Sequence, residues 1–554
     1  MKNTFKYIVF ISAAVLSLGS CKEWASGALD ITPSDRYSVE SVWSSETSAD
    51  TYMLGLYSFL KENDGVIGGD ANLTRFWDAY SDLIKSNSWN QYNHPYNAAF
   101  LQGPSSFNGQ NAGAFECWSD CYTRIRRCNE FLRDAPVYGP RISDTYAATR
   151  SGEIRYIRAC CYLKLMAVYG KCVKRDAVDG PDQNNKPLAD PEEIWDFIEE
   201  DLRYAAENIE KNQVRGRITR AAAWGLLSRA ALYAQRWDVV IEAAEKCEAA
   251  GGRFDPKGYA NVFADIDSPE NLLIFEYVSN KLTHRADVFF RPLGDGDENG
   301  KHPGANIYAV FGPTSELVDS YEMADGTPFS WVAHGDDPYT GREPRFYASI
   351  LYNGAPWEGR TIETYDTGLD KIVEFNISGA AGSTVTGYYL RKWITEGEEN
   401  WEKYGSDHFS IFQRFAEVVL NKAEAYAMKG EFEKANDELF RVRDRVGLPR
   451  KNGTTQETVM ADIKHERIVE LAGEGRRFWD LRRWRDAVEV INNKNFHGCW
   501  ITKGDGDTFT YKQVSCDGAG RVHTFLESYY AFSLPITEIS NNEEITTSDN
   551  NPGW

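Results

Sequence analysis

The chain lacks the short motifs that mark most metal-dependent and nucleophilic enzymes. It has no CxxC pair and only 8 histidines, so neither a zinc site nor a thiol redox site is indicated. HExxH, GxSxG and glycine-rich phosphate loops are also missing. A glycosidase needs two carboxylates across a cleft, and among 82 acidic residues no motif singles out such a pair. We therefore predict that the protein is not an enzyme and has no cofactor.

A run of about 18 or more uncharged apolar residues would predict a membrane-spanning helix. No such run occurs beyond the N-terminus. The run Tyr7–Cys21 follows Lys2 and Lys6 and is too short to span, so it is typical of a secretory signal. Its end, LGSC, resembles the bacterial lipobox. We predict that residues 1–20 are removed and that Cys21 is lipidated and anchors the mature chain to a membrane. An ordinary signal peptide that contains a cysteine is the alternative.

The composition favours an extracellular surface that binds flat, uncharged ligands. The net charge of −21 opposes binding of nucleic acid and of strongly acidic polysaccharides. Aromatic residues make up 13% of the chain, including 16 Trp and 30 Tyr, which exceeds what a core needs. Apart from Cys21 there are nine cysteines, which we expect to be small buried hydrophobic residues, although an exported protein can also form disulfides.

Apolar residues with helical spacing dominate both flanks of the chain. We predict helices over 41–60, 115–132, 152–169, 191–209, 220–250, 414–446 and 458–491. Residues 251–410 are rich in Gly, Pro, Asn and Asp, with short β-prone runs such as LLIFEYV, RFYASILYN and GYYLRKWI. We interpret this middle part as long ordered loops with short strands, which on a helical frame usually carry function.

Two helical segments share the spacing of a tetratricopeptide repeat, in which small residues let two helices approach and an aromatic ring follows the turn. The residues in this register are Ala423, Tyr426, Gly430, Phe432 and Ala435 in one segment, and Ser228, Ala231, Gln235, Trp237 and Val240 in the other. In the second segment Gln235 replaces the turn glycine. We expect both segments to be packing units, and peptide-binding grooves only as an alternative.

A series of segments, in order along the chain, resembles the SusD/RagB family of outer-membrane nutrient-binding lipoproteins. These are the lipobox, SVWSSETSADTYMLGLYSFL, RIRRCNEFL, GEIRYIRACCYLKLMAVYG, SYEMADGTPF followed by REPRFYASILYNGAPW, ERIVELAGEGRRFWDLRRW, and the terminal LPI and NNPGW. The resemblance covers the mature chain. It implies a mainly α, SusD-like fold in which tetratricopeptide-like helix pairs frame an irregular, loop-rich part with short strands.

The resemblance also implies an organisation and a function. Residues 1–20 are the lipoprotein signal peptide, 21–280 an N-terminal helical region, and 281–554 a C-terminal region with long loops and closing helices. Family members bind glycan at the cell surface and deliver it to a SusC-like, TonB-dependent transporter in the bacterial outer membrane. The RagB kind is associated with peptide, so a surface-anchored peptide-binding or protein-binding module is the alternative.

Sugar rings lie on aromatic faces, and their hydroxyl groups need amides or Arg beside those faces. The stretch 75–100 is the densest in such residues, and it matches the family region that supplies a stacking Trp. The glycan-binding candidates there are Arg75, Trp89, Asn90, Tyr92, Asn93 and Tyr96. We expect Trp77 and Tyr80, which fall at helical spacing, to lie in the core. Phe289, Phe290, Tyr308 and Trp331, with Trp357 as a similar case, are candidates for a second wall.

The segment DGDENG begins like a calcium loop, with Asp295, Asp297 and Asn299 at alternating positions. Position twelve of that loop is Asn306, where calcium loops have Glu, and Pro303 breaks any following helix. We therefore predict a solvated acidic turn and no metal, and calcium remains the weaker alternative.

The basic stretch Glu466–Trp484 carries five arginines and three aromatic residues in an otherwise acidic chain. Helical spacing on either side of Gly473 and Gly475 predicts a helix, a break and a second helix. Acidic residues in the stretch can pair with its arginines three or four residues away or across the break. We expect these arginines to hold helices together rather than to bind a polyanion.

Overall fold

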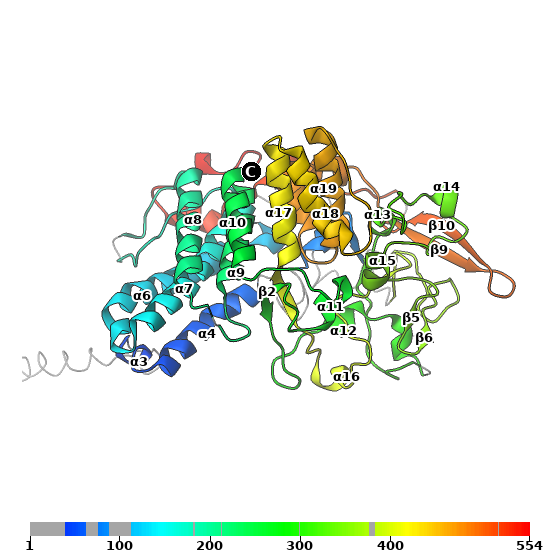
Figure 1. Cartoon of the computed structure of the whole chain (residues 1–554), viewed down its shortest axis with the longest axis horizontal. Coiled ribbons are helices and arrows are strands. Elements are labelled where there is room, and N and C mark those ends of the chain that lie inside the picture. The colour runs from blue at the N-terminus through cyan, green and yellow to red at the C-terminus, as the bar shows by residue number, and fades with distance from the viewer. Residues whose placement is uncertain are drawn as a thin grey trace, which may run out of the picture.

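The computed structural model shows a mainly α protein in which a row of helices supports an irregular part with short strands (Figure 1). It describes residues 39–62, 76–87, 112–180, 183–211, 213–298, 300–375, 383–518 and 520–554. The predicted signal segment 1–20 and the predicted lipidation site Cys21 lie outside these ranges. Within them, no helix is long and apolar enough to cross a membrane.

All the regions predicted to be helical contain helices, and the three longest are each divided. The frame consists of α4 (Glu46–Glu62), α6 (Trp118–Tyr138), α7 (Asp144–Tyr169), α8 (Pro191–Asn208), α9 (Arg220–Tyr233), α10 (Trp237–Ala249), α17 (Phe415–Met428), α18 (Phe432–Asp444), α19 (Gln456–Glu470), α20 (Arg477–Trp484) and α21 (Ala487–Ile491). Side-chain caps fix several N-termini, as where Ser143 accepts a hydrogen bond from the Tyr146 amide before α7. Asp190 caps α8 in the same way, with Pro191 as its first residue.

The frame helices pack in a continuous row. α6 contacts α7, α7 contacts α8, α8 contacts α9, and α9, α10, α17, α18 and α19 follow side by side (Figure 1). Buried ion pairs cross these contacts: Arg158 of α7 binds Asp201 of α8, and Arg229 of α9 binds Glu417 of α17. Apolar burial along each helix supplies most of the attachment, and the ion pairs fix the relative register of neighbouring helices.

The two segments with tetratricopeptide-like spacing form the helix pairs α9–α10 and α17–α18. Gly430 at the α17–α18 turn has φ +77°, and Gln235 at the equivalent turn is also left-handed, with φ +58°. The two pairs are far apart in the sequence, but α17 packs on both α9 and α10, and the Asn421 amide donates to Ser228 at 3.2 Å. The prediction of packing units is therefore confirmed, and the two pairs form one continuous layer.

The described ranges contain short strands in five two-stranded antiparallel sheets, and six of the ten strands, β2 to β7, lie wholly in the middle part of the chain. These are β1 (Ile84–Ser86) with β3 (Phe311–Pro313), β2 (Asn271–Phe275) with β8 (Ser410–Arg414), β4 (Ile350–Leu351) with β7 (Tyr389–Leu390), β5 (Pro356–Trp357) with β6 (Arg360–Thr361), and β9 (His497–Lys503) with β10 (Phe509–Ser515). The β9–β10 hairpin projects from the right end of the molecule (Figure 1). The predicted mixture of ordered loops and short strands is therefore found.

Short helices connect these strands and close the fold. They are α3 (Val39–Val42), α11 (Tyr259–Ala264), α12 (Ala286–Phe290), α13 (Ser315–Ser320), α14 (Trp331–His334), α15 (Pro344–Ser349), α16 (Trp401–Tyr404) and α22 (Ile536–Asn541). One β-prone run differs from its prediction. RFYASILYN begins inside α15, because Pro344 occupies the first helical position, and only Ile350 and Leu351 are in a strand.

The basic stretch forms the predicted helix, break and helix. α19 ends at Glu470, Gly473 and Gly475 have φ +73° and +70°, and α20 begins at Arg477. The pairing is less local than predicted, because the glutamates of the stretch bind cations from distant segments. The pairs are Glu466 with Arg345 and Arg443, Glu470 with Arg345, Arg414 and Arg445, and Glu474 with Arg414 and Lys392. Arg467 of α19 binds Asp480 of α20, and Arg483 of α20 binds Glu424 of α17, so these arginines hold helices together, as expected.

The nine cysteines of the described ranges are buried and unpaired. Burial raises the pKa of each thiol, for example that of Cys128 to about 12, so these side chains stay protonated. The prediction that they act as small hydrophobic residues is confirmed.

Candidate functional site

The residues predicted to form the N-terminal site are next to residues that the structure describes. The candidates Arg75, Trp89, Asn90, Tyr92, Asn93 and Tyr96 all lie outside the described ranges. Phe76 directly follows Arg75, and its ring packs on that of Phe311 in β3. Asn87 lies two residues before Trp89, and its side chain binds residues 308 and 309, just before β3. The second predicted wall can therefore be located relative to these two flanking residues.

Asn87 connects three segments directly after β1. Its backbone amide donates to Val310 at 2.8 Å, which continues the β1–β3 pairing by one residue. Its side-chain amide donates to the carbonyl oxygens of Tyr308 at 2.8 Å and Ala309 at 2.9 Å, and it also reaches that of Ser383 at 3.1 Å. Asn87 is buried, and Ala309 has a strained φ of +45°. The N-terminal stretch and the middle loops are thus held together at one point.

Phe289 and Phe290 do not form a wall of this site. Both are fully buried, at 0% exposure, on α12. Phe290 packs 5.3 Å from Phe76 and 5.5 Å from Phe311, measured between ring centroids. A sugar needs an accessible ring face, so these two buried rings belong to the core, contrary to the prediction that they line the site.

Tyr308 is the predicted wall residue that the structure places beside Asn87. Its ring is half-buried, and its hydroxyl accepts a hydrogen bond from the Asn306 amide at 2.7 Å. The guanidinium of Arg285, which is also half-buried, lies 5.7 Å from the centre of the Tyr308 ring. An aromatic ring, an amide and a guanidinium therefore meet here, the combination that a sugar ring and its hydroxyl groups require.

Arg285, Asn306 and Asn87 were not among the predicted site residues. They meet because β1 pairs with β3 and because the Tyr308 amide donates to Val288 of α12 at 2.8 Å. The pairing of β1 with β3 joins parts of the chain separated by more than 200 residues, and no motif or spacing in the sequence signals that pairing.

Trp331 lies in a different environment, on α14 near the β9–β10 hairpin (Figure 1). Its indole N–H donates to Asp319 at 2.8 Å, and the amide of Gln513 on β10 donates to the same oxygen at 3.0 Å. Burial raises the pKa of Asp319 to about 6 although the Trp331 hydrogen bond opposes the shift. The half-buried Trp331 ring therefore belongs to a second aromatic group at the right end of the molecule.

Asp295, the first residue of the weak calcium candidate, binds cationic side chains of the protein itself. Its carboxylate accepts hydrogen bonds from Arg360 at 2.7 Å, from Arg291 at 3.3 Å and from the Trp357 indole at 2.9 Å. Trp357 is buried by this contact and does not face a ligand. Asn299 lies outside the described ranges, within which no group of acidic, His or Cys side chains has the arrangement of a metal site.

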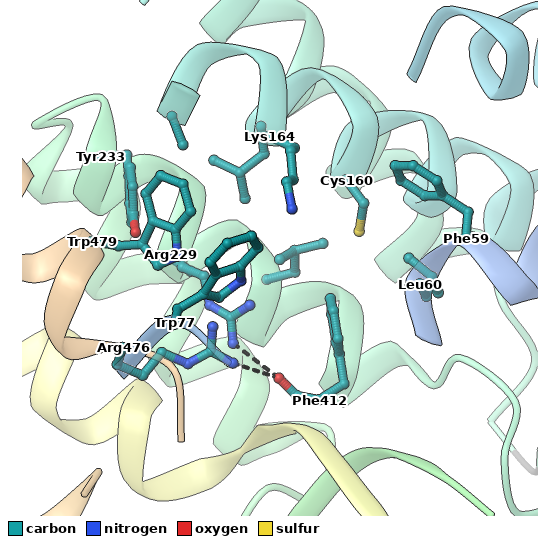
Figure 2. A pocket seen from close by; sticks show the side chains of 13 residues that line it. Phe59, Leu60, Trp77, Cys160, Lys164, Arg229, Tyr233, Phe412, Arg476 and Trp479 are labelled. Carbon is teal, nitrogen blue, oxygen red and sulfur yellow. Dashed lines mark hydrogen bonds between the residues drawn. The ribbon is translucent and has the colours of Figure 1, made fainter. Parts of the chain in front are cut away.

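A small cavity of about 90 Å³ lies between α4, α7, α9 and α20, where Trp77, Trp479 and Tyr233 meet cationic side chains (Figure 2). The Arg476 guanidinium donates to the Phe412 carbonyl at 2.7 Å, and burial lowers the pKa of Arg476. Ligand pockets usually enclose about 300–1,000 Å³, so this cavity is a gap in the core. Trp77 is 3% and Tyr80 1% exposed, which confirms that both are core residues.

Comparison with known proteins points to one family. Residues 273–554 match the sequence model of the SusD family. A SusD-like protein of Formosa agariphila, P25, is 23% identical over 524 residues, which cover 90% of this chain and 92% of the relative. A SusD-like protein of Bacteroides fragilis has the same fold, with a TM-score of 0.79, 27% identity and coverage of 94% of this chain and 100% of that one. A laminarin-binding SusD-like protein superimposes with a TM-score of 0.65 and 20% identity, covering 92% of this chain and 100% of its own.

Proposed function

The chain belongs to the SusD family, and on this premise we propose that it is a lipid-anchored protein of the bacterial outer membrane, facing the exterior. It binds an oligosaccharide or polysaccharide and delivers it to a SusC-like, TonB-dependent transporter for uptake. It is not an enzyme and needs no cofactor. In this proposal the mature chain begins at Cys21, and its helical region, 21–280, is followed by the loop-rich region 281–554. The match to the family model, which begins at residue 273, supports that division.

The arrangement around Asn87 and Tyr308 carries the glycan proposal. The side-chain amide of Asn87 fixes the backbone of Tyr308, and the half-buried ring of Tyr308 lies beside Arg285 and Asn306. Trp89, Asn90, Tyr92, Asn93, Tyr96 and Arg75 are the proposed contacts from the N-terminal side. The site is then a composite of loops on a rigid frame, which loses little entropy on binding. The laminarin-binding protein of the same fold supports a glycan as the cargo.

This function is tested by measuring glycan affinity with calorimetry and affinity electrophoresis. The protein is the chain from residue 22 onward, and the ligands are a panel of neutral glycans that includes laminarin. Trp89→Ala and Tyr308→Ala are expected to weaken binding at least tenfold, which corresponds to about 1.4 kcal/mol. Tyr308→Phe keeps the ring and should retain most of the affinity. Trp500→Ala removes another half-exposed ring, on β9, and serves as the matched control.

Binding of peptides and of no glycan in the panel would overturn the proposed cargo in favour of a peptide-binding protein of the RagB kind. Glycan binding that is unchanged in both Trp89→Ala and Tyr308→Ala would place the site elsewhere. Co-purification with a barrel transporter from the native outer membrane, lost when Cys21→Ala prevents anchoring, tests the proposed partner and location.

A further inference from the structure

A cleft of about 390 Å³ lies apart from the site around Asn87 and Tyr308. It is bounded by one face of α6, by residues 175–184 and by α22, and the α6 side lies at the left end of the view, far from α12 and the first site (Figure 1). The side chains that line it are aromatic, hydroxyl, amide and charged. They include Trp118, Ser119, Tyr122 and Thr123 of α6, Arg175 and Asp179 of the 175–184 segment, and Thr537, Glu538 and Asn541 of α22.

Buried polar contacts fix the walls of this cleft in place. The Asn129 amide, 3% exposed, donates to the carbonyl oxygens of Arg175 at 2.9 Å and Ala177 at 3.0 Å, which attaches the 175–184 segment to α6. The indole of Trp118 donates to Glu538 at 3.1 Å, which attaches α22 to α6. The Asn542 side-chain amide donates to the carbonyl oxygen of Lys186 at 2.9 Å, which attaches α22 to the chain just after residues 175–184. The cleft is therefore preformed, and a ligand would not have to order it.

The open surface of the cleft presents small hydrogen-bonding groups at helical spacing. Ser119 and Thr123 on α6 and Thr537 and Asn541 on α22 are each four residues apart, and all four are exposed. Tyr122, between the two α6 hydroxyls, is half-buried, with the Arg175 guanidinium 5.9 Å from its ring centre. Hydroxyl groups and an amide around a partly exposed ring can replace the water around sugar hydroxyls while the ring contacts a sugar face.

The cleft carries charges of both signs. Arg175 binds Asp179 at 2.5 Å between Nη1 and Oδ2, and Lys186 binds the other oxygen of Asp179 at 2.6 Å. Glu538 accepts hydrogen bonds from Trp118 and from Asn542 at 2.9 Å. A strongly charged ligand would meet like charges on one wall or the other, so the lining favours an uncharged, hydroxyl-rich ligand.

We infer that this cleft is a second glycan-binding site, which takes a short stretch of a neutral oligosaccharide. The inference rests on the proposed function and adds to it a site that the loop candidates do not include. Its volume falls within the about 300–1,000 Å³ of small-molecule sites. Two separate sites on one molecule can bind the same polysaccharide chain, which raises its apparent affinity above that of either site alone.

Hydrogen–deuterium exchange with a neutral oligosaccharide, the glycan from the panel that binds best, locates the second site. The expected result is slower exchange on binding in two separate regions, one near residues 285–310 and one in residues 118–130, 173–186 and 536–542. Slower exchange in the first region alone would overturn the second site and leave the proposed function intact. If the wild-type chain binds no glycan of the panel at all, the proposed function and this inference fail together.

Two matched substitutions on α22 give an independent test. Thr537→Trp fills the cleft, whereas Ser540→Trp places the same ring at an exposed position of the same helix that does not line the cleft. Both positions are exposed, so both variants are expected to fold as the wild type does. We expect Thr537→Trp to abolish the slower exchange at residues 118–130 and to lower affinity for a long polysaccharide at least fivefold, while Ser540→Trp changes neither. Equal behaviour of the two variants would overturn the inference.

Discussion

Arg467 and Asp480 lie on opposite sides of the glycine break between α19 and α20 and form a two-point ion pair. Nε of Arg467 is 2.7 Å from Oδ2 of Asp480, and Nη2 is 3.0 Å from Oδ1. Both side chains are almost completely buried. Arg483 binds Asp480 from the second helix at 2.8 Å, so this carboxylate fixes the angle at which the two helices meet.

Replacing Asp480 by Asn is therefore expected to destabilise the fold strongly. The change keeps the shape of the side chain but leaves Arg467 without a carboxylate partner in the core, which costs about 3–5 kcal/mol. Urea unfolding followed by circular dichroism measures the loss. Glu527→Gln removes one partner of the exposed pair Arg485–Glu527 and should cost less than about 1 kcal/mol. Equal losses in the two variants would contradict the structural role of the buried pair.

The break and the two helices could be predicted, because glycine spacing and apolar periodicity are local properties of the sequence. The partners of the charges could not. Glu466 and Glu470 bind Arg345, which is more than 100 residues away. Nothing in the sequence distinguishes Arg345 from the other arginines as their partner. Which of them meets a given glutamate is decided by how α15 packs on α19.

Acid should weaken the contact between α9 and α17. Burial alone would raise the pKa of Glu417, but the charge of Arg229, followed by that of Arg476, outweighs it and lowers the pKa to about 2. A carboxyl group with a lowered folded-state pKa contributes stability above its unfolded pKa and loses it as pH falls. We expect this contribution to shrink by about 2 kcal/mol between pH 6 and pH 3.

Urea unfolding at several pH values, compared between the wild type and Glu417→Gln, measures that contribution. The difference in unfolding free energy between the two proteins should be largest at neutral pH and decrease toward pH 3, because the neutral amide does not titrate. A difference that stays constant with pH would show that Glu417 does not carry the effect.

The two equivalent turns of the helix pairs offer a reciprocal test of backbone strain. Gln235 has φ +58° and is exposed, so Gln235→Gly should stabilise the protein by up to about 1 kcal/mol, because glycine adopts this conformation without strain. Gly430 has φ +77° and open space where a Cβ would lie, so Gly430→Gln should destabilise by a similar amount through the backbone alone. Thermal unfolding of both variants and of the exchanged double variant checks the signs. The same sign for both single variants would rule out the explanation.

The site residues, like the ion-pair partners, could be predicted only in part from the sequence. The sequence alone does not distinguish Phe289, Phe290 and Tyr308, because each is an aromatic residue near polar neighbours in the loop-rich part of the chain. The short helix α12 turns both Phe rings into the core, whereas Tyr308 follows the Asn306 amide and stays half-exposed. Because burial depends on the pairing of β1 with β3, sequence composition could not separate wall residues from supporting ones.

Two buried asparagines provide a final prediction that separates the two proposed sites. Asn87 holds the carbonyl groups of Tyr308 and Ala309 beneath the first site, and Asn129 holds those of Arg175 and Ala177 beside the second. Replacing either by Ala leaves buried acceptors without a donor, which costs about 1–3 kcal/mol of stability in each case.

The effects on glycan binding should differ even though the losses of stability are similar. Asn87→Ala is expected to lower glycan affinity about tenfold at the first site, which corresponds to about 1.4 kcal/mol, and to leave the exchange of residues 173–186 on binding unchanged. Asn129→Ala should abolish the slower exchange at 173–186 and retain the affinity of the first site. Calorimetry combined with hydrogen–deuterium exchange on the same samples measures both. If either variant altered both regions equally, the two sites would be coupled. The side-chain N–H groups of Asn87 donate to residues 308, 309 and 383, and those of Asn129 donate to residues 175 and 177, so these hydrogen bonds do not join the two sites.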